Sequence, residues 1–334
     1  MPAATNRQIL LVEVPQGKLG VEHFTLREAD IPRPNEREVC LAVRYISLDA
    51  ANRAWMQGAT YRAAVVAGSV MSGTAVAEVV ESKAPQFQVG DLVFADTGWQ
   101  DYAVLPAKRL IRLPQIEPIT HLLSVYGITG LTAYFGLLKV AAPRPGETVV
   151  VSAAAGSVGS IAGQIAKLKG CRVIGIAGGQ AKCDWLLHEL GFDAAVDYKA
   201  GATFTALKAA APQGIDVYFD NVGGEIFEAC LAQMTIAGRI SCCGAISGYD
   251  GAPPTAGPRG VPGLIVIKRL TVKGFIVSDF FAEREHAIAE LKGWVADKKL
   301  KVYEDVIEGL ENTPGALIGL LAGHNRGKRM VKVA

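Results

Sequence analysis

The sequence predicts an α/β protein that joins a doubly wound parallel sheet to a mostly β domain. From Thr148 to about Val277, short apolar runs alternate with helical stretches, as in a parallel sheet covered by helices. Residues 1–125 show a different pattern, with alternating segments and turns but no strand–helix alternation. The chain of 334 residues is long enough to form both domains.

The first 125 residues predict an antiparallel, barrel-like domain. Turn residues such as Pro32–Pro34 and Gln88–Gly90 separate its strand candidates. These candidates are Gln8–Val14, Glu38–Ser47, Gly73–Val80, Leu92–Phe94 and Asp101–Pro106. Residues 301–334 return to short strands around a small helix, so we expect the tail to rejoin this domain. The expected division is residues 1–125, completed by 304–334, and residues 126–303.

The stretch 147–179 organises the second domain. A β-branched run, Thr148–Val151, leads to the turn Gly156-Ser157-Val158-Gly159, a helical pattern and a second run, Val173–Ile176. Glycine lets the backbone turn tightly and approach a pyrophosphate, whose charge is stabilised at a helix N-terminus. This order of elements predicts a dinucleotide site at the turn, although the glycine spacing departs from G-x-G-x-x-G. A tight turn without a ligand is the alternative.

The end of the second strand indicates which dinucleotide would bind. Folds that select NAD place an acid there to bind the ribose 2′-hydroxyl. Here the strand ends Ile176-Ala177-Gly178-Gly179, the next acid is Asp184, and Lys182 lies within reach. A lysine makes a strong, charge-assisted contact to a 2′-phosphate. The sequence therefore favours NADPH over NADH, with a solvated surface lysine as the alternative interpretation of Lys182.

The remaining elements of the second domain are five helical patterns and one loop. The helical patterns are Gly127–Tyr134, Lys182–Leu190, Thr203–Ala211, Gly224–Met234 and residues 279–298. Between residues 248 and 263, five glycines and four prolines predict a long loop. Such a loop inside a compact domain is typical of a functional lid or a disordered segment.

Composition argues against several other classes of protein. A net charge of +2 gives no broad basic field, which argues against nucleic acid as a partner. Five scattered histidines and six cysteines form no short-spaced ligand set, so we expect no metal site. No apolar run reaches membrane-spanning length, and no secretory signal pattern precedes the first strand. We expect a cytoplasmic protein with reduced thiols.

Further motifs are spread over nearly the whole chain. They are Gln88–Leu92, Gly98–Tyr102, Thr129–Tyr134, Ala153–Gly159, Gly163-Gln164, Tyr218–Gly224, Cys243–Ser247 and Asn325–Lys328. With these motifs the chain resembles a zinc-independent medium-chain dehydrogenase/reductase. More narrowly, it is similar to the NADPH-dependent alkenal and alkenone double-bond reductases, which include leukotriene B4 dehydrogenase/prostaglandin reductases and curcumin reductases. This resemblance implies a GroES-like first domain, a Rossmann second domain, and a homodimer formed through the nucleotide domain.

The resemblance also implies roles for individual residues. Gly156 to Gly159 would hold the pyrophosphate of NADPH, and Lys182 and Tyr198 would hold the 2′-phosphate. The ribose and nicotinamide would contact a larger set: Asn221, Cys243, Gly244, Ala245, Ile246, Ser247, Tyr249, Phe275, Ile276, Val277 and Asn325. Other interpretations are a strand-end aromatic for Tyr198, a buried strand for Phe275–Val277, and an ordinary turn residue for Asn221.

The implied reaction needs a donor at the substrate carbonyl. Hydride reaches the β-carbon of an α,β-unsaturated ketone or aldehyde, and negative charge builds on the carbonyl oxygen as an enolate. A phenol or water must then protonate the α-carbon, and the cofactor's own ribose 2′-hydroxyl is a further donor to the oxygen. Tyr61 and Tyr249 are the catalytic candidates, with a role as pocket wall as the alternative for each.

Two departures from the family pattern affect the substrate side. The chain reads Leu48-Asp-Ala-Ala-Asn-Arg53 where many members read Leu-Asp-Pro-Tyr-Met-Arg, and Ile267 stands where leukotriene-type enzymes carry a tyrosine. Both changes favour a bacterial-type enone reductase over a prostaglandin reductase. An NADPH:quinone oxidoreductase and a non-catalytic, crystallin-like nucleotide-binding protein are the competing hypotheses.

Overall fold

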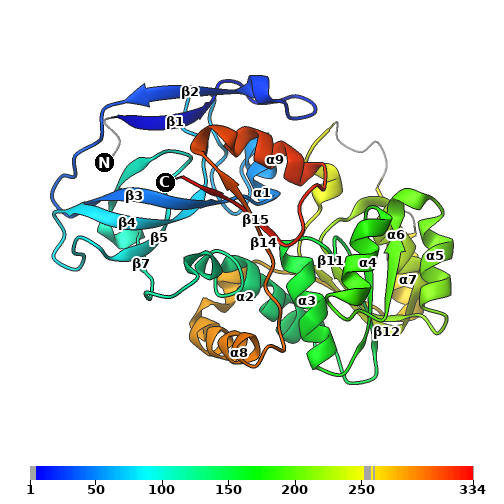
Figure 1. The fold of residues 1–334 in the computed structure, drawn as a ribbon. Helices are drawn as coiled ribbons and strands as arrows, with labels where there is room; N and C mark the ends of the chain where they lie inside the picture. Colours follow the sequence, from blue (N-terminus) through cyan, green and yellow to red (C-terminus); the bar gives the residue numbers. More distant parts are fainter. Residues whose placement is uncertain (1–4, 252–256, 259, 334) are drawn as a thin grey trace.

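Two sheets of different construction carry the fold (Figure 1). The computed structural model describes residues 5–251, 257–258 and 260–333. Part of the glycine- and proline-rich segment 248–263 therefore lies outside the described residues. Of the helices that are described, none is long and apolar enough to cross a membrane.

The first sheet has six parallel strands in the order β10-β9-β8-β11-β12-β13. Their bounds are Thr148–Val151 (β8), Arg172–Ala177 (β9), Ala194–Asp197 (β10), Ile215–Asp220 (β11), Met234–Cys242 (β12) and Thr271–Gly274 (β13). The order reverses between β8 and β11, which is the topology of a doubly wound nucleotide-binding sheet. The predicted fold class is confirmed.

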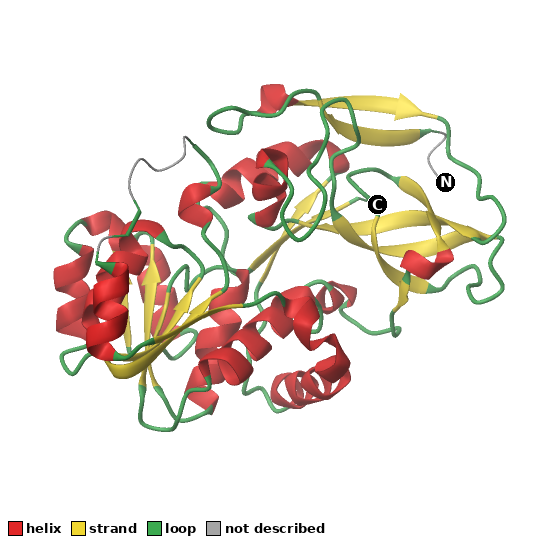
Figure 2. Cartoon of the chain, turned by 180° about the vertical axis from the view of Figure 1, so that it is seen from behind, coloured by secondary structure: helices red, strands yellow, loops and turns green. Residues whose placement is uncertain are grey.

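Helices cover both faces of this sheet, as Figure 2 shows. Because neighbouring residues of a strand point to opposite faces, Val149 and Val151 belong to one hydrophobic core and Val150 belongs to another. The first core contains residues of α2 (Ile128–Phe135), α3 (Ser157–Leu168), α4 (Gln180–His188) and α8 (Arg284–Ala296). The second contains residues of α5 (Thr203–Ala210) and α6 (Gly224–Gln233), and α7 (Val261–Lys268) packs against it.

The second sheet is mostly antiparallel and has seven strands. Six follow the order β14-β15-β3-β4-β5-β7, and β6 pairs with β3. The bounds are Glu38–Ser47 (β3), Thr74–Ser82 (β4), Leu92–Asp96 (β5), Tyr102–Pro106 (β6), Ile111–Arg112 (β7), Glu304–Glu308 (β14) and Lys328–Lys332 (β15). The C-terminal strands join this sheet because β15 pairs with β3. We call this part the β domain; the boundaries 1–125, 126–303 and 304–334 stay a prediction.

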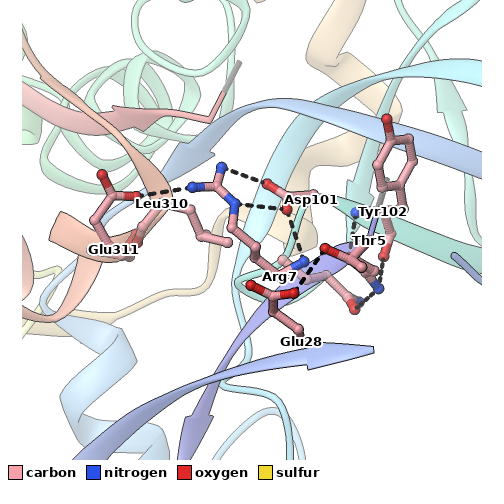
Figure 3. Close-up of polar contacts among 10 residues, drawn as sticks. Thr5, Arg7, Glu28, Asp101, Tyr102, Leu310 and Glu311 are labelled. Carbon is pink, nitrogen blue, oxygen red and sulfur yellow. Dashed lines mark hydrogen bonds and ion pairs between the residues drawn. The ribbon is translucent and has the colours of Figure 1, made fainter. Parts of the chain in front are cut away.

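A separate antiparallel pair, β1 (Asn6–Leu11) and β2 (Phe24–Ala29), lies over the β domain. Arg7 ties this pair to its neighbours (Figure 3). Its guanidinium donates to both carboxylate oxygens of Asp101 at 3.0 Å and to Glu311 at 3.2 Å. Asp101 precedes β6, and Glu311 belongs to the short helix η8 (Leu310–Asn312), so one side chain joins three distant segments.

The remaining elements are short. Two are α1 (Ala51–Gln57), which follows β3, and α9 (Thr313–Leu321), which precedes β15. The 3-10 and π segments are Val21–His23, Ala107–Arg109, Ile119–Leu122, Gly136–Ala141, Tyr198–Ala200, Ile246–Gly248 and Val277–Glu283. Two details differ from the sequence expectation. The helix expected at 279–298 starts as a 3-10 turn before α8, and α7 begins inside the segment expected to be a loop.

Candidate active site

A cavity of about 610 Å³ lies at the carboxyl ends of the parallel strands, between the two domains. Open α/β sheets bind ligands at this edge, where the strand order reverses. The residues predicted from sequence that line it are Gly156, Ser157, Val158, Gly159, Lys182, Tyr198, Asn221, Cys243, Gly244, Ile246, Ser247, Tyr249 and Asn325. The β domain contributes Asp49, Ala50 and Ala51, and the end of α9 contributes Leu320 and Leu321.

The glycine turn forms one wall of the cavity. Gly156 is the N-cap of α3, so the unpaired N–H groups of a twelve-residue helix begin at the cavity. A Cβ built on Gly159 would lie 2.4 Å from the carbonyl oxygen of Ala153 and 2.9 Å from Cα of Ala154. Any side chain at position 159 would therefore displace the turn. These residues fit a pyrophosphate held by backbone and helix dipole.

A cluster of cations lies at the end of β9. Lys182 lines the cavity, and its Nζ donates to the carbonyl oxygen of Gly323 at 2.7 Å. Burial lowers the pKa of Lys182, and the nearby charges of Lys199 and Arg326 lower it further. Three positive groups in one place are costly unless an anion joins them, so the donor set fits a 2′-phosphate.

Tyr198 and Lys199 reach this cluster because of a glycine. A Cβ on Gly178 would lie 2.9 Å from Cε of Lys199 and 3.0 Å from the hydroxyl of Tyr198. The Asp197 carboxylate accepts from the backbone N–H groups of Gly179 (2.8 Å) and Lys199 (2.9 Å), which joins the two strand ends. Lys199 and Arg326 were not predicted from the sequence as site residues. Each directly follows a residue that was predicted, Tyr198 and Asn325 respectively.

A buried carboxylate fixes the turn at the point where the strand order reverses. Asp220 is 3% exposed, and its Oδ1 accepts from the Tyr218 hydroxyl (2.6 Å) and from the N–H groups of Val222 (2.9 Å) and Gly223 (3.0 Å). Asn221 donates to the carbonyl oxygen of Ser152 at 2.8 Å and lines the cavity. Asp220 and Asn221 therefore form a turn, as the alternative interpretation of Asn221 expected. The same turn also places Asn221 at the cavity.

The segment after β12 forms the opposite wall. The Tyr249 hydroxyl accepts from the backbone N–H of Ala245 at 3.1 Å, which folds the segment back on itself beside the cavity. Ala245 itself does not line the cavity. Burial and the neighbouring Asp220 raise the pKa of the Cys243 thiol to about 12. Cys243 is therefore a protonated wall residue at neutral pH rather than a nucleophile.

Four further predicted residues do not line the cavity. Tyr61 is 61% exposed and packs edge-on against Trp55, with ring centroids 6.4 Å apart. Phe275 packs against Phe280, and Phe275 and Val277 contact the core under the sheet. Ile276 is partly exposed in the turn after β13. Phe275–Val277 do not line the cavity, but they directly follow Gly274, which pairs with Cys242, so they lie next to the strand end that leads to Cys243.

The residues that could hold a metal do not come together. Among residues 5–251, 257–258 and 260–333, no three of the His, Cys, Asp and Glu side chains form a group suited to a metal ion. A zinc site needs about four converging ligands. The described side chains therefore do not fit zinc.

Comparison with known proteins places the chain in a family. Residues 7–113 match the family described as the N-terminal domain of oxidoreductase, and residues 157–293 match the zinc-binding dehydrogenase family. The NADPH-dependent curcumin reductase of Escherichia coli (strain K12) is 41% identical over 98% of this chain and 97% of its own. Prostaglandin reductase 1 of Bos taurus is 43% identical over 92% of this chain and 93% of its own.

A solved structure agrees over the whole fold. CurA from Vibrio vulnificus in complex with NADPH superposes with a TM-score of 0.94 at 40% identity, over 98% of this chain and 99% of that one. The zinc of the second family's description has no counterpart among the described side chains. Sequence, fold and cavity agree, and the chain belongs to the medium-chain dehydrogenase/reductase family, together with these curcumin and prostaglandin reductases.

Proposed function

We propose that this protein is an NADPH-dependent reductase of the carbon–carbon double bond of α,β-unsaturated ketones and aldehydes. The observation that carries the proposal is the interdomain cavity, which has a glycine turn on one wall and is lined by Lys182 and Lys199, with the charge of Arg326 close to Lys182. A 2′-phosphate neutralises that cluster, whereas the 2′-hydroxyl of NADH does not. The relatives at 41% and 43% identity support the same reaction class.

The chain binds and orients the cofactor in two places. The backbone N–H groups of Gly156 to Gly159 would donate to the pyrophosphate, and Lys182, Tyr198 and Lys199 would hold the 2′-phosphate. When bound, NADPH supplies a hydride for the β-carbon of the substrate. Asn221, Cys243, Gly244, Ile246 and Ser247 line the cavity with Tyr249, and they would hold the ribose and nicotinamide.

The substrate side supplies a hydrogen-bond donor and apolar walls. Negative charge develops on the substrate carbonyl oxygen, so a donor aimed at that oxygen stabilises the transition state. Two phenols line the cavity; Tyr198 lies in the cation cluster, and we assign the donor role to Tyr249. Ala50, Ala51, Leu320 and Leu321 offer apolar surface beside Asp49. Burial raises the pKa of Tyr61, and the nearby Asp49 and Tyr249 raise it further, so we assign Tyr61 a weaker role at the mouth of the site.

We further infer that two chains associate through the nucleotide domain. β13 is the edge strand of the parallel sheet, and all four of its residues are exposed. An exposed edge strand is a template for pairing with another chain. On the adjacent helix α7, Val266 is 74% and Ile267 is 69% exposed. A homodimer would cover both features.

All six cysteines are free thiols, which supports a cytoplasmic location.

A substrate panel tests the proposed function. NADPH and NADH are each assayed with an aliphatic enal, an enone, a curcuminoid and a benzoquinone. We expect oxidation of NADPH with the conjugated carbonyls and much less with NADH. Turnover with benzoquinone but with no enal or enone would identify a quinone oxidoreductase instead.

A further inference from the structure

A buried arginine of the β domain contacts the segment that carries Tyr249. Arg53 lies on α1 and is 1% exposed. Its Nε donates to Oδ1 of Asp250 at 3.1 Å, and its Nη2 donates to the carbonyl oxygens of Gly17 (2.7 Å) and Pro15 (3.4 Å). Asp250 directly follows Tyr249, so this ion pair joins the β domain to the cavity wall of the nucleotide domain.

Two further hydrogen bonds hold the same segment. Nε2 of Gln57 donates to the carbonyl oxygen of Tyr249 at 3.0 Å. Gln57 lies four residues after Arg53, so both side chains leave the same face of α1. The backbone N–H of Leu19 also donates to Oδ1 of Asp250, at 2.7 Å. Tyr249 and Asp250 are thus fixed by α1 and by the loop that contains Leu19.

Because Arg53 is buried, its charge depends on where the segment with Tyr249 and Asp250 lies. A buried guanidinium is costly unless it is paired and hydrogen-bonded. Nη1 of Arg53 has no hydrogen-bond partner within the described part of the chain. The charge therefore depends on Asp250 and two carbonyl groups, and moving Tyr249 and Asp250 away from α1 would leave it unpaired.

We propose that Arg53 is a positioning residue that acts through Asp250 on Tyr249. Arg53 is not among the residues that line the cavity, but its ion pair seats the segment so that Tyr249 does line it. The inference rests on the proposed function, because Tyr249 is assigned there as the donor to the substrate. It adds that the position of Tyr249 at the cavity depends on a contact between the two domains.

Two substitutions of Arg53 and one control test this role. Arg53→Met removes the charge and the forked donors, whereas Arg53→Lys keeps the charge. We expect Arg53→Met to lower kcat for an enone about tenfold, with the Kd for NADPH within about twofold of wild type, and Arg53→Lys to fall between. Arg44→Met is the control because Arg44 forms a 2.8 Å ion pair with Glu78, and both residues belong to the β domain. This variant should keep the wild-type kcat and the wild-type Kd for NADPH.

A double substitution separates positioning from general damage. If Arg53 acts through Tyr249, Arg53→Met should cost little more in a Tyr249→Phe background. The full tenfold loss in both backgrounds would overturn the proposal. If Arg53→Met does not fold, the loss of kcat caused by Arg53→Lys or by Asp250→Asn is compared in the wild-type and Tyr249→Phe backgrounds instead.

Hydrogen exchange gives a readout that does not depend on turnover. The backbone amides of residues 243–250 should exchange faster in Arg53→Met than in wild type and Arg44→Met, because the segment loses its anchor. Unchanged exchange would contradict the positioning role. A wild-type protein that reduces no enone, with exchange that still responds to Arg53→Met, would contradict the proposed function and leave the anchor intact.

Discussion

The two walls of the cavity are built in different ways. The cofactor wall consists mainly of backbone at strand ends: the glycine turn after β8, the Ala177-Gly178 end of β9 and the turn after β11. The substrate wall consists of side chains from three distant segments, α1, the end of α9 and the segment around Tyr249. The cofactor wall therefore follows from local sequence, whereas the substrate wall exists only once the two domains are packed together. Substitutions should show the same contrast.

The largest effect is expected at the cofactor wall. Gly159→Val should weaken NADPH binding by roughly 100-fold or more, because even a Cβ would lie 2.4 Å from the carbonyl oxygen of Ala153. Titration by cofactor fluorescence measures this. Gly293→Ala on α8 is the control, since a Cβ there meets nothing within 4 Å. Normal binding by Gly159→Val would place the pyrophosphate elsewhere.

A smaller and more selective effect is expected at the cation cluster. Lys182→Ala should raise the Kd for NADPH about 10- to 100-fold, the value of one charge-assisted contact, and leave the Kd for NADH nearly unchanged. Lys208→Ala, an exposed lysine on α5, should change neither value. Equal losses for both cofactors would show that Lys182 does not contact the phosphate.

At the substrate wall, the effect should appear in turnover instead of in cofactor binding. Tyr249→Phe should lower kcat about tenfold, because it removes a donor that water replaces poorly, with little change in the Kd for NADPH. Tyr61→Phe should lower kcat less than about threefold, since its side chain is exposed and outside the cavity. A larger effect from Tyr61→Phe would reverse the two assignments.

The smallest effect is a pH dependence of cofactor choice. The pKa of Lys182 lies below its ordinary 10.5 in the free protein, and a bound 2′-phosphate should raise it again. The preference for NADPH over NADH is therefore fully present below the pKa of Lys182 in the free protein, and it is lost as the pH rises from there through the higher pKa of Lys182 in the complex. We expect the ratio of the two Kd values to fall by about threefold between neutral pH and the alkaline end of the stable range. A flat ratio would contradict the assignment of Lys182.

The same contrast explains how much the sequence could predict. The strand, turn and helix from Thr148 to Leu168 lie within one short stretch, so glycine spacing and apolar pattern were enough to predict them. Lys182 was predicted to contact the cofactor because an acid is missing from the strand end. Arg326 was not predicted, because only the folded C-terminal tail brings it close to Lys182. The ion pair of Arg53 and Asp250 joins residues 197 positions apart, and no local pattern signals it.

One error has a specific physical cause. The start of α7 was missed because glycine and proline dominate the segment before it, although Pro262 at the beginning of a helix is compatible with helix geometry. A contact of Phe275–Val277 with the cofactor stays a prediction: these residues follow Gly274, which pairs with Cys242 at the edge of the cavity, but they do not line the cavity themselves.

The most direct test of the central claim follows an isotope from cofactor to product. NADPH that carries transferable deuterium at C4 is incubated with the protein and a simple enone, and the product is analysed by NMR. We expect a saturated ketone with deuterium on the β-carbon alone. Deuterium on the carbonyl carbon of an alcohol, or none in the organic product, would contradict it.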